Sequence, residues 1–357
     1  MFDVALVNHT PFAADTHLQM DGEGQEVLVA VACATFYAPD DDGPVRLAAK
    51  QEPVRFIDEP RGNPARSSIV FESDISPFKP RVDVIVEGAA HAAPGREASE
   101  ALVSLRLADI HKTLRVMGDR SSRRDASPKP FRTMPIVYER ALGGSASQGD
   151  ACVENPVGVG WRGTTSVDAS VATAAPNVEY DDPRAARHGG RTLPAGFGIV
   201  ARHWQPRVGF AGTYDAAWLD TTWPLPPADF DSLFHQVAPL DQQTASVSGG
   251  EIVELTNVTP SGCWRFRLPT LDVPVHLVYE DRVESRPVRI DTVAIDANRR
   301  IVTLKWRLAV RCVRNAPALR SIVLGHVTPA WLSARQRGKT WLARGHAFVA
   351  DRPLFHA

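Results

Sequence analysis

Residues 194–242 read PAGFGIVARHWQPRVGFAGTYDAAWLDTTWPLPPADFDSLFHQVAPLDQ, which combines aromatic side chains with proline and glycine. We expect its tryptophans, Trp204, Trp218 and Trp223, to be buried, because a packed tryptophan removes roughly 150–250 Å² from water. The prolines lack a backbone donor and the glycines permit turns, so no long helix or strand fits here. The stretch predicts an ordered set of bends on which the rest of the chain packs.

The end of this stretch has helical spacing. Asp229 is a candidate N-cap, and Pro239 ends the pattern. The apolar residues between them are Phe230, Leu233, Phe234 and Val237. We therefore expect one short amphipathic helical turn here.

Apolar and polar residues alternate on both sides of the stretch, as in half-buried antiparallel strands. The predicted strands cover residues 26–37, 81–87, 102–107, 251–256, 263–268, 273–280, 288–296 and 300–310. The last two form a hairpin through the Asn-containing turn at 297–299. The prediction is a mainly β protein of antiparallel sheets, in two sandwich-like halves with one or two short helices and long Pro/Gly-rich connections.

Changes in composition divide the chain into four parts. We expect an N-terminal β domain over residues 1–125, a long Pro/Gly/Ser-rich connection over 126–192, a C-terminal β domain over 193–310 and a basic extension over 311–357. The extension holds eight basic residues and one acidic residue. Its apolar side chains favour docking on the acidic body, and the alternative is a contact with a partner protein.

Charge and cysteine usage exclude several classes of protein. Forty basic residues against 41 acidic residues leave a net charge of −1, so neither nucleic acid nor a membrane is an expected partner. The first residues lack a charged and apolar signal segment, which predicts a cytoplasmic protein. The four cysteines form no C-x-x-C pair, so we expect reduced thiols and no metal site.

The acidic residues of the stretch are the strongest catalytic candidates. Asp215, Asp229, Asp231 and Asp241 occur there together with His203 and His235. No catalytic, cofactor-binding or metal-binding motif accompanies them, and turns commonly use aspartate as a cap. We therefore predict no catalytic, cofactor or metal residues. The alternative is an enzyme that acts on a small molecule or glycan through residues 215–241.

Arg207 lies between Trp204 and Tyr214 in the sequence. It is expected to pair internally with Asp215 or a carbonyl, and the alternative is a ligand clamp. The candidate partner-binding or fold-defining residues are Trp204, Arg207, Tyr214, Asp215, Trp218, Asp229, Phe230 and Asp231.

Several motifs together resemble one bacterial family. FGIVARHWQPRVGFAGTYDAAW and PADFDSLFHQVAPLDQ are preceded along the chain by SDISPFKPRVDVIVEG, VMGDR, MPIVYERALGG, NPVGVG and PNVE. In this order they resemble the family called domain of unknown function 2169, over roughly residues 1–310.

The resemblance implies a function that the composition alone does not. Members are encoded in type VI secretion clusters beside toxic effectors. The implied role is a non-enzymatic adaptor or chaperone, without a cofactor, that holds a type VI effector protein and helps load it onto the spike protein VgrG or PAAR. The family supplies no catalytic residue to transfer to this sequence.

Overall fold

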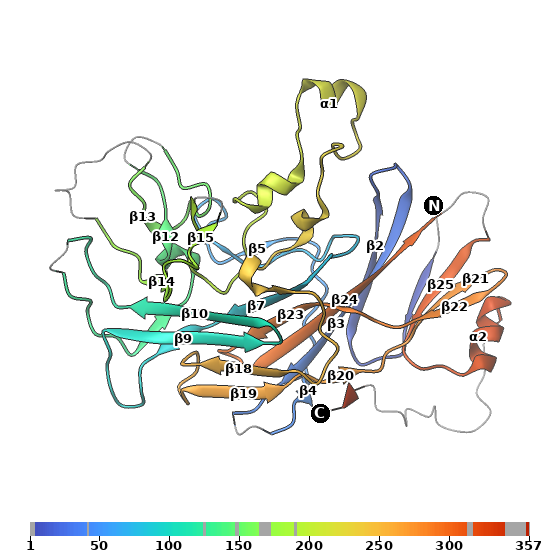
Figure 1. Ribbon diagram of the computed structural model, residues 1–357. Helices are drawn as coiled ribbons and strands as arrows, with labels where there is room; N and C mark the ends of the chain where they lie inside the picture. The colour runs from blue at the N-terminus through green and yellow to red at the C-terminus, as the bar shows by residue number, and fades with distance from the viewer. Residues whose placement is uncertain are drawn as a thin grey trace.

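The computed structural model describes residues 4–40, 43–123, 126–146, 150–163, 173–188, 191–312, 317–339 and 355–356. Its fold is mainly β with several antiparallel sheets, which confirms the predicted class (Figure 1). No helix in these residues is long and apolar enough to cross a membrane.

The largest sheet has seven strands. Its order is β17 (Gln243–Thr244), β7 (Val82–Glu87), β23 (Ile290–Asp296), β24 (Ile301–Arg311), β3 (Glu26–Tyr37) and β2 (Ala13–Met20), with β4 (Arg46–Leu47) pairing β3. The predicted hairpin is confirmed as β23 and β24, which pair antiparallel. Strand β3 has the predicted bounds. Its β-branched and aromatic residues favour a strand, and this one is buried on both faces.

Two further sheets pack against the first. The five-stranded sheet has the order β14 (Val178–Tyr180), β10 (Ile110–Met117), β9 (Glu100–Leu107), β18 (Ile252–Thr256) and β19 (Cys263–Arg267). The four-stranded sheet has the order β1 (Ala5–Asn8), β25 (Leu319–Leu324), β21 (Val275–Tyr279) and β22 (Val283–Arg286). One hydrophobic cluster contains residues from all three sheets, so they share one core.

The remaining elements are short. Two-stranded pairs are β5 (Glu59–Pro60) with β6 (Ile69–Phe71), β8 (Ala89–His91) with β11 (Thr133–Pro135), β12 (Leu142–Gly143) with β13 (Val159–Gly160), β15 (Arg187–His188) with β16 (Arg191–Thr192), and β20 (Thr270–Leu271) with β26 (Phe355–His356). The helices are α1 (Ala216–Thr221), α2 (Pro329–Gln336) and the 3-10 turns η1 (Tyr138–Arg140), η2 (Arg207–Ala211), η3 (Ser232–His235) and η4 (Leu240–Gln242).

The expected division of the chain does not coincide with a division between sheets. Strands β3 and β7 of the first expected domain share one sheet with β23 and β24 of the second. The expected connection also contributes strand β14 to the five-stranded sheet. In the basic extension, β25 lies between β1 and β21 with a buried side-chain row, so this part is docked on the body. Residues 340–354, which include Trp341 and Phe348 of the extension, lie outside the described part.

Candidate functional site

Residues 212–231 form a projecting segment that rises from the body and carries α1 at its tip (Figure 1). Asp215 begins α1, because its carboxylate accepts a hydrogen bond from the Trp218 amide at 2.8 Å. The Trp218 indole donates to the Leu225 carbonyl at 2.9 Å, and its ring packs edge-on against Tyr214 at 4.7 Å. These contacts hold the tip in one conformation. Helix α1 carries no helical period that the sequence could reveal, because its six residues are too few.

The tip of the projecting segment exposes large apolar side chains. Tyr214 is 55% exposed, Leu219 59% and Trp223 64%, whereas Trp204 is 1% exposed. The expectation that all three tryptophans of the stretch are buried is therefore confirmed only for Trp204, because Trp218 is partly exposed and Trp223 is exposed. Trp223 follows α1 at the tip, and its side chain is mostly in contact with solvent. This segment presents apolar surface to solvent.

Two aspartates fix the base of the projecting segment. Asp229 accepts hydrogen bonds from the Thr213 amide at 2.9 Å and its hydroxyl at 2.8 Å, which ties the two ends of the segment together. Asp231 caps η3 by accepting from the Leu233 amide at 2.8 Å. The predicted helical turn is thus present as a 3-10 helix, but its cap is Asp231 instead of Asp229. Phe230 packs against Phe234 at 5.9 Å.

Trp204 and Arg207 anchor the stretch in the body. Trp204 packs edge-on against Tyr138 at 5.3 Å. Arg207 is 5% exposed and donates to the carbonyls of Val200 at 2.9 Å and Phe234 at 2.7 Å. Its carboxylate partner is Glu72, which it contacts through both terminal nitrogens. The predicted pairing with a carbonyl is present, whereas the other predicted partner, Asp215, caps α1 on the projecting segment.

Asp83 on β7 holds the end of the same stretch. This fully buried carboxylate accepts from the amides of Val237 and Ala238, both at 3.0 Å, and from the Gln236 side chain at 2.9 Å. Lys79 donates to it at 2.6 Å. Three charge-assisted hydrogen bonds therefore fasten the Pro/Gly-rich stretch to the large sheet, and Lys79 supplies a fourth from outside the stretch. The sequence offered no signal for this contact between residues so far apart.

An open groove of about 1070 Å³ separates the base of the projecting segment from the end of the large sheet. Its lining combines the end of β2, the start of β3, residues 77–78, residues 226–232, His235 and the end of β24. The main apolar residues in it are Met20, Val27, Phe78, Pro226, Phe230 and Ala309. The groove is therefore open to solvent and partly apolar.

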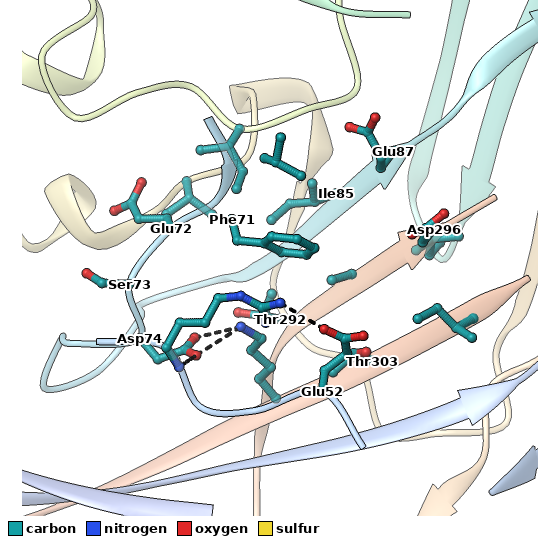
Figure 2. Close-up of a pocket in the computed structure, with 18 of the residues that line it drawn as sticks. Glu52, Phe71, Glu72, Ser73, Asp74, Ile85, Glu87, Thr292, Asp296 and Thr303 are labelled. Atoms are coloured by element: carbon teal, nitrogen blue, oxygen red, sulfur yellow. Dashed lines mark hydrogen bonds and ion pairs between the residues drawn. The ribbon is translucent and has the colours of Figure 1, made fainter. Parts of the chain in front are cut away.

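A second, smaller pocket lies on the outer face of the large sheet, under residues 52–74. Figure 2 shows Phe71 and Ile85 together in this pocket, with Asp74 and Glu52 beside them. Lys305 donates to both Asp74 oxygens, at 2.7 and 3.0 Å. Burial raises the pKa of Asp74, but Lys305 and further donors outweigh burial and hold this pKa below its usual value. The charges here are satisfied internally, and the cavity of about 70 Å³ is far below the roughly 300 Å³ of common ligand pockets.

A family model described as "Uncharacterized protein conserved in bacteria (DUF2169)" matches residues 23–307. The chain belongs to this family. The DUF2169 match includes the projecting segment, Asp83 and Glu72, and it leaves out β1, β2 and β25. The matched range is shorter than the range of about 1–310 over which the sequence motifs resemble the family. No curated protein and no solved structure matches the chain.

The four candidate aspartates of this DUF2169 protein do not all converge on one pocket, although Asp229 and Asp231 both line the groove. Asp215, Asp229 and Asp231 act as caps or turn acceptors, and Asp241 pairs with the buried Lys112 at 2.9 Å in a different place. His203 accepts from the Trp204 indole at 3.0 Å. Among the described residues, no group of three or more His, Cys, Asp or Glu side chains could hold a metal ion. The arrangement is that of structural carboxylates.

His235 lines the groove and makes the stability of this DUF2169 protein depend on pH. Burial and the cations Arg207, Arg307, Lys79 and Arg202 lower its pKa to about 4. The unfolded chain, with a histidine pKa near 6.5, therefore binds more protons than the folded protein between pH 6.5 and 4.

We expect this difference to destabilise the fold by about 1–3 kcal/mol as the pH falls from 6.5 to 4. Denaturant unfolding at several pH values measures the effect. His235→Gln should reduce the pH dependence in this window, and the part that remains is expected from His9, His17, His91 and His276, whose pKa values burial also lowers. An unchanged slope in His235→Gln would assign the effect to other groups.

Proposed function

We propose that this protein is a non-enzymatic adaptor that binds a protein client through the projecting segment and the adjoining groove. The client is proposed to be a type VI secretion effector, which the adaptor carries in the cytoplasm to the spike protein VgrG or PAAR. The observation that carries the proposal is the ordered exposure of Tyr214, Leu219 and Trp223 at the tip of the segment.

Physical chemistry supports a protein as the ligand of this surface. Protein interfaces are enriched in tryptophan and tyrosine, and a few such residues supply most of the binding free energy. The Asp215 cap and the packing of Trp218 on Tyr214 order the tip before binding. A pre-ordered surface loses less conformational entropy when the client binds.

The type VI assignment rests on the sequence resemblance to effector adaptors. The proposed partners are therefore the effector and the spike protein, neither of which requires a catalytic site on this chain. The geometry does not bring the four aspartates together as the enzyme alternative requires. Asp229 and Asp231 share the groove, Asp215 and Asp241 do not line it, and all four serve caps, turns or an ion pair.

Two tryptophans of the same stretch provide a matched test. Trp223→Ala should leave the free energy of unfolding within about 0.5 kcal/mol of wild type, because the ring is exposed. It should nevertheless weaken client binding by about tenfold or more, as expected for an interface tryptophan. Trp204→Ala should instead lower stability by about 3–5 kcal/mol, because the ring is buried.

The measurements are thermal unfolding of both variants and co-purification of the neighbouring effector from the native host. If the effector co-purifies with Trp223→Ala as well as it does with the wild-type protein, the proposed binding surface is wrong. Failure of the wild-type protein to bind the effector or affect its abundance would contradict the adaptor function itself.

A further inference from the structure

Strand β2 is the last strand of the large sheet and has one free edge. It pairs with β3 on one side, and no described strand pairs with its other side. The Thr16 amide donates to the Asp15 carboxylate at 2.8 Å, so it points away from β3. Amides alternate in direction along an antiparallel strand, and those of Leu18 and Met20 therefore face the same free edge as Thr16.

Exposed strand edges bind other strands unless they are protected. Asp15 protects this edge at Thr16, but no hydrogen bond of this kind covers Leu18 or Met20 among the described residues. The side chains of Leu18 and Met20 are both about half exposed. The unprotected end of β2 leads directly into the open groove, which Met20 lines together with Pro226 and Phe230.

The surroundings of this edge are acidic. Asp15, Asp229 and Asp231 are exposed, and the last two line the groove. The basic group of the groove, Arg311, already pairs with Asp21 at 2.8 Å and Glu23 at 3.1 Å. Among the described residues, Asp15, Asp229 and Asp231 form no ion pair, so a segment that enters here meets exposed carboxylates that favour lysine or arginine.

The two faces of β2 differ in character. Leu18 pairs with Leu28, whose side chain belongs to the main core, whereas His17 pairs with Val29, which belongs to a separate cluster on the outer face. Leu18 and Met20 thus share one face, and Asp15 lies on the other, where Val27 and Ala309 line the groove. An added strand would contact Leu18 and Met20 on one face and Asp15 on the other, with Asp229 and Asp231 of the groove near its end.

We propose that β2 binds an extended segment of the client as an additional strand, in which apolar residues alternate with lysine or arginine. The apolar residues pack on Leu18 and Met20, and the basic residues lie near Asp15 and the groove aspartates. This inference specifies the binding mode of the proposed adaptor and rests on that function.

A defined peptide tests the inference without the client. The probe is an eight-residue peptide of alternating valine and lysine, the length of β2, and its control replaces lysine with glutamate. Hydrogen exchange of the full-length protein reports each backbone amide. The lysine peptide should protect the amides of Leu18 and Met20 from exchange, and the glutamate peptide should not. Equal effects of both peptides, or no protection by either, would overturn the proposal.

Two variants distinguish the contribution of the Leu18 backbone amide to peptide binding from that of the Leu18 side chain. Leu18→Pro removes the edge amide, and Leu18→Ala retains it while also losing the leucine side chain. We expect the lysine peptide to bind Leu18→Pro about tenfold more weakly than Leu18→Ala, as for the loss of one or two hydrogen bonds. Equal affinity for the two variants contradicts strand addition.

The exposed Asp15→Lys provides a second test that does not depend on how Leu18→Pro folds. This variant should bind the lysine peptide more weakly than the wild-type protein does, and an unchanged affinity would contradict the proposed charge pattern.

The outcomes also distinguish strand addition at β2 from the adaptor function. If Trp223→Ala loses client binding but the peptide does not protect β2 of the full-length protein, the adaptor function stands and strand addition at β2 is wrong. Peptide protection at β2 in a protein that binds no client would remove the adaptor function and leave β2 as a peptide-binding edge.

Discussion

Replacing Glu72 with alanine is expected to lower the free energy of unfolding by about 3–5 kcal/mol. The change leaves the Arg207 guanidinium without its carboxylate partner, although the arginine is 5% exposed and cannot reach water without rearrangement. A buried, unpaired charge is more costly than the loss of one contact. Denaturant unfolding measures the change. Because Arg207 also holds the carbonyls of Val200 and Phe234, we expect the base of the projecting segment to loosen as well.

The double variant Glu72→Ala, Arg207→Met is the control for this interpretation. It removes both charges, so it should be more stable than Glu72→Ala alone. If the double variant is as unstable as the sum of the two single variants, the pair is not coupled and the orphaned charge is not the cause.

Ending the chain at Val310 is expected to abolish cooperative folding. The deletion removes β25, which lies between β1 and β21 and buries Ser321, Ile322, Val323 and Leu324. Both neighbouring strands would then expose an unpaired edge and an uncovered part of the core. Circular dichroism and size-exclusion chromatography of the truncated protein measure the outcome, which we expect to be unfolding or aggregation.

Two substitutions in the full-length chain control for the size of this deletion. Ile322→Ala should cost about 2–5 kcal/mol, because the side chain is fully buried. Arg320→Ala in the same strand should change stability by less than about 0.5 kcal/mol, since its ion pair with Glu280 is exposed. A truncated protein that unfolds at the wild-type temperature would show that β25 is dispensable.

The sequence predicted those elements whose signal is local. Strand β3 and the β23–β24 hairpin follow from residue type and from period-two alternation around a short turn. The packing of Trp204 and the internal role of Arg207 follow from their large, partly apolar side chains. These properties depend on neighbouring residues and can be recognised without the tertiary fold.

The remaining features depend on residues far apart in the chain. Glu72 pairs with Arg207 across 135 positions, and Asp83 binds residues more than 150 positions later. The exposure of Trp223 could not be predicted, because a tryptophan in a Pro/Gly-rich stretch is equally compatible with a packed bend. The shared sheets likewise join strands from both ends of the sequence, whereas composition suggested separate domains.

Site-specific photo-crosslinking in the native host tests the client-binding surface most directly. A photoreactive residue at Leu219, on the tip of the projecting segment, should crosslink to a secretion effector that mass spectrometry identifies. The same residue at Leu102, an exposed position on β9, is the matched control and should not crosslink to that protein. Crosslinking of the effector at Leu102 but not at Leu219 would contradict the account.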